Sequence, residues 1–158
     1  MHSYRMLVEK DTENVRQLLA AYPLQFPPFV VERYPARWAA FLSGGDSGTS
    51  EFWVATNEDD EVIGHAGFLH NPEWGIDEIV GVVVSPKCSN RGVGRGFLHP
   101  LCSRIQSRGG TRVVLFTLGH PGNAGTVAFY RAIGFELTAL EKDYFAEGYS
   151  RITFSKTL

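Results

Sequence analysis

The sequence predicts one α/β domain with a mixed, mostly antiparallel sheet of six to seven strands and about four flanking helices. The chain has 158 residues, which is enough for one compact domain and too few for two of ordinary size. Leu, Ile, Val and Phe number 44, above the roughly one-fifth of a chain below which an ordered core does not form. Strand and helix patterns alternate in the second half and indicate a parallel strand–helix–strand unit. We therefore expect a single domain over residues 1–158.

The expected strands are segments with alternating or continuously apolar residues. They are Ser3–Val8, Phe52–Thr56, Val62–Leu69, Glu78–Val84, Arg112–Leu118, Phe135–Leu140 and Tyr149–Ser155. The acidic turn at residues 57–61 joins the second and third of these as a hairpin, and Gly148 marks the turn of a last hairpin. Between Gly44 and Ser50 we expect a connector.

The expected helices repeat apolar residues at helical spacing. They run from Asp11 or Thr12 to about Ala21, from about Ala36 to Leu42, from Val93 to about Ser107, and from Asn123 to Ala132. Pro100 lies inside the third helix and removes a hydrogen bond to residue 96, so we expect a kink or a break there. The stretch Tyr22–Trp38 mixes four prolines with aromatic residues and is expected to be irregular until the second helix, as a lid over a pocket or as packing at the core edge.

Glycine and charge are distributed unevenly along the chain. Ten of the 17 glycines lie between Gly81 and Gly134. The stretch from Ile79 to Phe135 contains no Asp or Glu and seven Lys or Arg, so the formal net charge of −2 combines +7 in this stretch with −9 elsewhere. A glycine-rich, basic and acid-free stretch is typical of a site where phosphates approach the backbone. The alternative is chance together with solvated helix faces.

Several classes of protein are disfavoured by the composition. The near-neutral total charge argues against nucleic-acid or membrane-surface partners, and no apolar run has the length of a signal peptide or a membrane span. Cys88 and Cys102 have no Cys or His partners at metal-ligand spacing. We expect a cytoplasmic protein with reduced thiols and no metal, either a monomer or a homodimer.

The strand Glu78–Val84 leads into the turn Arg91–Gly96 and then a helix. Such a turn leaves several backbone N–H groups unpaired beside the positive end of a helix, which is a pyrophosphate-binding arrangement. A dinucleotide fingerprint is excluded because Phe97 stands where its third glycine would be. The chain also lacks the Gly-Lys-Ser/Thr of a nucleotide-triphosphate loop.

Two motifs in this region resemble those of the GNAT superfamily of acyl-coenzyme-A-dependent N-acyltransferases. The family's Gln/Arg-x-x-Gly-x-Gly/Ala pattern falls on Ser89–Gly94, with Ser89 departing from it, and Asn123 followed by Phe129–Phe135 is similar to the second signature. The resemblance implies a GNAT-like domain whose sheet contains a splayed parallel pair, Glu78–Val84 and Arg112–Leu118. It also implies acetyl-CoA as co-substrate, with its pantetheine arm between these strands.

The resemblance and the residues together give a candidate site. The expected co-substrate contacts are Val82, Val83, Val84, Asn90, Arg91, Gly92, Val93, Gly94, Arg95, Gly96, Asn123, Phe129 and Tyr130. Asn123 is expected both to cap its helix and to bond the pantetheine arm. A bulge or splay at Val82–Val84 would offer a free N–H to the oxyanion.

Glu78 and Tyr130 are the expected catalytic residues. An alkylammonium of pKa ~10.4 is almost entirely protonated near neutral pH, so Glu78, or His70 in reserve, would accept its proton. The Tyr130 phenol, of pKa ~10, would protonate a thiolate of pKa ~8.5, which matches the family's general acid. The alternatives are a solvent-facing carboxylate for Glu78, a solvated loop side chain for His70 and a core aromatic for Tyr130.

The expected reaction is acetyl transfer from acetyl-CoA to a primary amine by direct attack in a ternary complex. The alternative is a non-catalytic acyl-CoA sensor or partner-binding domain. The acceptor is left open between a small amine and a protein N-terminus, and the acidic remainder of the chain favours a cationic one. The candidate acceptor contacts are Phe26, Phe29, Glu78 and Tyr144.

Overall fold

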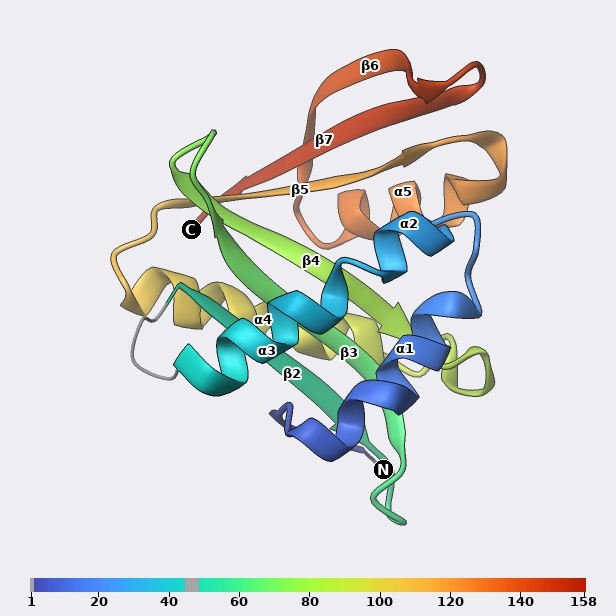
Figure 1. The fold of residues 1–158 in the computed structure, drawn as a ribbon. Helices are drawn as coiled ribbons and strands as arrows, with labels where there is room; N and C mark the ends of the chain where they lie inside the picture. The colour runs from blue at the N-terminus through green and yellow to red at the C-terminus, as the bar shows by residue number, and fades with distance from the viewer. Residues whose placement is uncertain (1, 45–48) are drawn as a thin grey trace.

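The computed structural model describes residues 2–44 and 49–158, which form a seven-stranded sheet with helices on both faces (Figure 1). Residues 45–48 of the expected connector lie outside the described part. The strands are β1 (Ser3–Met6), β2 (Ser50–Thr56), β3 (Val62–Asn71), β4 (Ile76–Val84), β5 (Arg112–Gly119), β6 (Glu136–Ala146) and β7 (Tyr149–Thr157). Their order is β1-β2-β3-β4-β5-β7-β6, and β4 and β5 are the parallel pair in an otherwise antiparallel sheet. The expected mixed sheet is confirmed.

The helices form two layers (Figure 1). They are α1 (Thr12–Ala20), α2 (Pro28–Val31), α3 (Tyr34–Gly44), α4 (Val93–Ser107) and α5 (Ala124–Ala132). Helices α1 to α3 cover one face over a core that includes Leu19, Trp38 and Phe52, whereas α4 and α5 cover the other face, where Phe97 and Phe154 are buried. Among the described helices, none combines the length and the hydropathy needed to cross a bilayer.

The proline-rich stretch is more regular than expected. Helix α2 was expected as irregular chain, and α3 begins at Tyr34 instead of near Ala36. Pro28 and Pro35 both fall in the first turn of a helix, where the missing N–H would have no intrahelical partner. Proline therefore starts these helices instead of preventing them.

Of the expected kink or break at Pro100, the break is absent, because helix α4 continues through this residue. The side chains of Phe97, Leu101 and Ile105 flank the proline and are almost fully buried in one core. Their packing outweighs the single hydrogen bond that the proline ring removes.

Candidate active site

The parallel strands β4 and β5 separate along their length. They pair only at Asp77 with Val113 and at Glu78 with Val114, although β4 continues to Val84. Beyond Glu78 the β5 side of β4 therefore has no strand partner. The expected splayed pair is confirmed.

A β-bulge interrupts β4 inside the splay. The register with β3 shifts from Val80 opposite Gly67 to Val83 opposite His65, so Gly81 and the next residue share one partner position. Gly81 has φ +65°, and a Cβ there would lie 2.8 Å from the Cε1 atom of His65. Glycine is required at this position both by the backbone conformation and by the neighbouring ring.

His65 holds the bulge from the neighbouring strand. Its Nε2 accepts a hydrogen bond from the Trp38 indole N–H at 3.0 Å, so its Nδ1 carries the proton and donates to the Gly81 carbonyl at 2.8 Å. The ring is fully buried and stacks on Phe52. Burial lowers the pKa of His65 to about 4, so the ring is neutral at physiological pH.

A cleft of about 450 Å³, the β4–α4 cleft, opens where β4 has separated from β5 and α4 begins. Ten of the expected co-substrate contacts line it: Val82, Val83, Val84, Asn90, Gly92, Val93, Gly94, Arg95, Phe129 and Tyr130. Lining residues that the sequence reasoning missed include Tyr22, Gln25, Cys88, Gly125 and Thr126. No Asp or Glu is among the described residues that line the cleft.

The turn before α4 presents backbone donors to this cleft. Asn90 and Gly92 have φ of +64° and +78°, which turns the chain sharply into the helix. The first intrahelical bond runs from the Gly96 N–H to the Gly92 carbonyl, so the N–H groups of the first turn have no partner within the helix. A Cβ on Gly94 would be in ordinary van der Waals contact with the Phe129 ring, at 3.4 Å. Free donors, a helix N-terminus and Arg95 together suit a pyrophosphate.

Two tyrosines fix the walls of the cleft. The Tyr22 hydroxyl donates to the Val84 carbonyl at 2.7 Å and so ties the end of β4 to the chain after α1. The Tyr4 hydroxyl donates to the Val93 carbonyl at 2.8 Å, and a Cβ on Gly96 would overlap that hydroxyl. Gly96 therefore packs against Tyr4 and is outside the lining of the cleft, as are Arg91 and Asn123.

Asn123 occupies the N-cap position of α5, as expected, but its side chain makes no capping hydrogen bond, so this part of the prediction is wrong. Its side-chain amide donates to the Leu118 carbonyl at 2.8 Å and to the Thr117 hydroxyl at 3.2 Å. Acceptors at the end of β5 compete successfully with the helix N-terminus because the side chain is buried against that strand. Asn123 thus ties the start of α5 to the end of β5.

Tyr130 places a phenol at the floor of the cleft. Its ring is 4% exposed and packs against Phe129, Phe135 and Phe154. Within residues 2–44 and 49–158, nothing forms a hydrogen bond with its hydroxyl. Burial raises the pKa of Tyr130, so the phenol keeps its proton throughout the working pH range.

Glu78 lies at the last paired position before the splay. Its Oε1 accepts a hydrogen bond from the Asn71 amide at 3.0 Å. Burial raises the pKa of Glu78, while that hydrogen bond and the charges of nearby arginines act in the opposite direction. His70, the reserve base, is an exposed residue of β3 with its Nδ1 3.3 Å from Asp77 Oδ1, so the expectation of a loop there is wrong.

The expected acceptor contacts separate into two groups. Phe26 is buried in the core beneath α1 to α3, with 6% of its surface exposed. Phe29 and Tyr144 are about half exposed, and each ring has an arginine over it. Phe29 and Tyr144 are therefore accessible to a ligand, whereas Phe26 supports the core.

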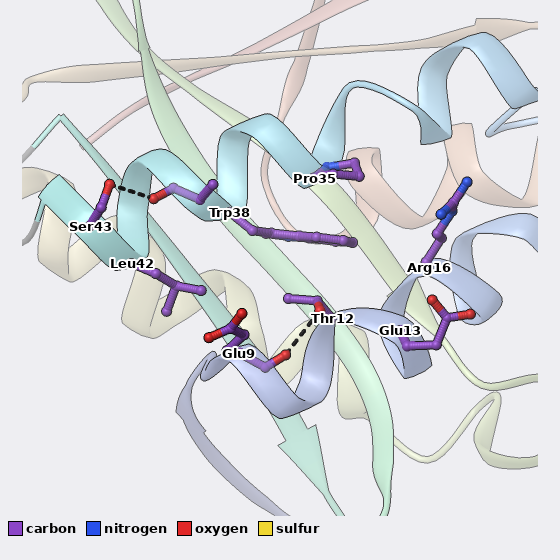
Figure 2. Close-up of a pocket in the computed structure, with 9 residues that line it drawn as sticks. Glu9, Thr12, Glu13, Arg16, Pro35, Trp38, Leu42 and Ser43 are labelled. Atoms are coloured by element: carbon purple, nitrogen blue, oxygen red, sulfur yellow. Dashed lines mark hydrogen bonds between the residues drawn. The ribbon is translucent and has the colours of Figure 1, made fainter.

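A second depression, the α1–α3 groove, lies between those two helices (Figure 2). It has a volume of about 520 Å³, and Glu9 and Glu13 stand on its α1 side. The Thr12 hydroxyl donates to the Glu9 carbonyl at 2.9 Å, and the indole N–H of Trp38 is already bonded to His65. The Thr12 hydroxyl and the Trp38 N–H are therefore used within the protein, and two carboxylates against the single Arg16 among the described lining residues disfavour an anion.

Comparison with known proteins agrees with this architecture. Residues 14–135 match the model of the acetyltransferase (GNAT) family. The chain belongs to the GNAT family. The family prediction and the acyltransferase class are thereby confirmed. Among curated proteins, none matches the chain significantly.

Solved structures share the GNAT fold over nearly the whole chain. A GNAT-family protein from Desulfovibrio desulfuricans is 23% identical and has a TM-score of 0.88, with 99% of each chain covered. A phosphinothricin acetyltransferase from Sinorhizobium meliloti in complex with acetyl-CoA is 19% identical, with a TM-score of 0.79 and coverage of 99% and 88%. The yncA protein from Salmonella typhimurium with its cofactor acetyl-CoA is 17% identical, with a TM-score of 0.77 and coverage of 100% and 94%.

Proposed function

We propose that this GNAT protein transfers an acetyl group from acetyl-CoA to a primary amine by direct attack in a ternary complex. The observation that carries the proposal is the composition of the β4–α4 cleft. One continuous lining joins unpaired N–H groups at the start of α4, the bulged part of β4 and the phenol of Tyr130. Two similar structures contain acetyl-CoA, which supports the same co-substrate here.

The first turn of α4 is the proposed phosphate site. Its backbone N–H groups and Arg95 would donate to the pyrophosphate oxygens, and the absence of a side chain at Gly92 allows close approach. The open, bulged side of β4 would then take the pantetheine arm in place of a neighbouring strand. Acetyl-CoA supplies a thioester whose carbonyl carbon accepts a nucleophile.

Glu78 is the proposed general base. A carboxyl group with a raised pKa is better matched to proton transfer near neutral pH than an ordinary one. Glu78 would take the ammonium proton directly or through water, and the neutral amine then forms the new C–N bond. Backbone N–H groups of Val82–Val84 that point into the splay would stabilise the negative charge on the carbonyl oxygen.

Tyr130 is the proposed general acid. As the C–S bond breaks, the sulfur gains an electron pair, and Tyr130 would donate its hydroxyl proton to it. Because the raised pKa keeps this hydroxyl protonated, the acid is present in every turnover. The ammonium nitrogen loses two protons: Glu78 takes the first and releases it to solvent, and the second leaves the nitrogen for solvent after the C–N bond has formed. Tyr130 recovers from solvent the proton that it gave to the sulfur, so one proton is released overall.

The experiment combines binding with turnover. Acetyl-CoA should raise the melting temperature of the protein, and release of free thiol should depend on an added primary amine. Stabilisation by acetyl-CoA with no thiol release across a broad panel of amines would favour the non-catalytic sensor. If acetyl-CoA neither stabilised the protein nor released free thiol, this result would contradict the co-substrate assignment itself.

A further inference from the structure

Three arginines lie over aromatic rings on the side of the sheet that carries Glu78. The guanidinium carbon of Arg37 lies 5.0 Å from the Tyr34 ring centroid, and that of Arg33 lies 5.6 Å from the Phe29 centroid. The guanidinium carbon of Arg151 lies 4.5 Å from the Phe116 ring centroid and 4.1 Å from that of Tyr144. We call this the arginine–aromatic surface: Phe29, Arg33, Arg37, Phe116, Tyr144 and Arg151.

The topology brings this surface to Glu78. Val114 of β5 is the partner of Glu78, and Phe116 follows two residues later on the same face of the strand. Arg151 is the β7 partner of Leu118 and therefore shares that face. In addition to the burial that raises the Glu78 pKa, the charges of Arg37, Arg151 and Arg33 act on its carboxyl group.

The three guanidinium groups differ in their partners. Arg151 is neutralised by Glu141, with an Nη2–Oε1 distance of 2.7 Å. Arg33 and Arg37 form no ion pair with any described residue, although Arg37 is half buried. A half-buried guanidinium without a carboxylate leaves hydrogen-bond donors unused, and its planar fork matches a carboxylate in two-point contact.

We infer that the acceptor is an amine that carries a carboxylate, as an amino acid does, and that Arg37 and Arg33 bind this carboxylate. The inference rests on the proposed acetyl transfer. The exposed rings of Phe29 and Tyr144 favour an apolar side chain on the same acceptor. The cationic acceptor expected from the acidic remainder of the chain is disfavoured here, because the arginines next to Glu78 would repel a second positive charge.

The first experiment compares acceptors on the wild-type protein. Phenylalanine, phenylalaninamide and phenethylamine share a ring and a primary amine, but only phenylalanine carries a carboxylate. The kcat/KM for phenylalanine should exceed that for the amide by about 10- to 100-fold, the range expected of charge-assisted hydrogen bonds. The amide has the less basic amine and hence more neutral nucleophile at a given pH, so this difference in basicity works against the expected result.

The second experiment assigns the preference to residues. Arg37→Gln and Arg33→Gln should each reduce the ratio of the kcat/KM for phenylalanine to that for the amide. This ratio is the readout, because the charges of Arg37 and Arg33 also act on Glu78 and their loss changes the turnover of both acceptors. Arg37→Lys keeps the charge but not the planar fork and should retain part of the preference. The matched control is Arg16→Gln, an exposed arginine of α1 in the α1–α3 groove, which should leave the preference unchanged (Figure 2).

The outcomes separate the inference from the proposed function. Equal kcat/KM for the three acceptors in the wild-type protein would overturn the carboxylate assignment and leave acetyl transfer intact. A strong preference that Arg37→Gln and Arg33→Gln both preserve would also overturn it. Absence of thiol release with every acceptor, while acetyl-CoA still stabilises the protein, would overturn the proposed transfer and the acceptor assignment with it.

Discussion

The β4–α4 cleft and the α1–α3 groove have similar volumes, about 450 and 520 Å³, but differ in the polar groups they leave unpaired. The cleft offers the unpaired first-turn N–H groups of α4 and the free Tyr130 hydroxyl, and no acidic side chain lines it. The groove carries Glu9 and Glu13 against the single Arg16 in its described lining, and the Trp38 N–H is already bonded. The comparison teaches that unpaired backbone donors and the net local charge identify a binding site where size does not.

The largest effect is expected for a substitution that blocks the backbone donors of the β4–α4 cleft. Gly92→Val should weaken acetyl-CoA binding by at least ~100-fold, because a β-branched residue is strained at φ +78° and its side chain fills the space left for phosphate. Isothermal titration calorimetry measures this loss. Gly109→Val is the matched control, since Gly109 also has a positive φ and open surroundings but lies outside the cleft. Equal loss in both variants would attribute the effect to strain alone.

His65 links the two regions, because it bonds both Trp38 in the groove and Gly81 beside the cleft. His65→Phe should lower the free energy of unfolding at pH 7 by roughly 2–4 kcal/mol, because the Gly81 carbonyl and the Trp38 N–H lose their partner. Urea denaturation provides the measurement. The stabilising contribution of a neutral His65 is complete above the unfolded pKa of 6.5 and is lost as the pH falls towards the folded value of about 4.

The wild-type protein should therefore lose roughly 2 kcal/mol more than His65→Phe between pH 7 and pH 5. Parallel stability curves for the two proteins over this range would contradict the buried neutral state. Calorimetric titration of His65→Phe with acetyl-CoA reports whether the β4 bulge depends on the His65 ring, because a bulge that collapses should also weaken acetyl-CoA binding.

Tyr130→Phe tests the free hydroxyl of the cleft. Turnover should fall by about 100-fold, the lower range for loss of a general acid, because the departing sulfur loses its proton donor. Acetyl-CoA should still raise the melting temperature by the wild-type amount, since the ring and its packing remain. Wild-type kcat in this variant would remove Tyr130 from the acid role.

Glu78→Gln tests the base at the paired end of the splay. The wild-type pH profile of kcat/KM should have an acidic limb displaced above the ordinary carboxyl pKa, because burial raises the pKa of Glu78 and only the ionised form accepts a proton. The variant should lose this limb and about 10-fold or more in rate at neutral pH, with water as the remaining acceptor. An unaltered profile would transfer the role to His70 or to solvent.

The smallest effect is expected in the α1–α3 groove. Glu13→Gln removes an exposed carboxylate there, so acetyl-CoA affinity and kcat should both stay within about twofold of wild type. Stability should fall by only a few tenths of a kcal/mol through the lost interaction with the α1 dipole. A marked loss of turnover would show that the groove takes part in the reaction after all.

The parts of the molecule that sequence reasoning predicted correctly are those determined by local patterns. Apolar periodicity located all seven strands, and the density of glycine located the turn before α4. The prolines between Tyr22 and Trp38 led to the wrong prediction of an irregular chain. Proline is disfavoured in the interior of a helix but is tolerated in its first turn, where Pro28 lies.

The parts it missed depend on contacts between distant segments. His65 reads as one polar residue in an apolar strand, and its role follows only when Trp38 of α3 and Gly81 of β4 come to its two ring nitrogens. Tyr22 bonds a carbonyl 62 residues away. Asn123 was expected to follow a local capping rule, yet the end of β5 supplied acceptors that no local pattern reveals.

The brief pairing of β4 with β5 also divides the molecule mechanically. Two residue pairs are all that join the main chain of β1–β4 to that of β5–β7 among the described residues, so hydrogen bonds contribute little tensile strength along this seam. The continuity comes from α4, whose Phe97 and Leu101 share one core with Phe68 on one side of the seam and Phe154 on the other. Helix α4, which begins at the proposed phosphate site, thus also holds the two parts of the sheet together. Side-chain packing would resist a force applied across the sheet.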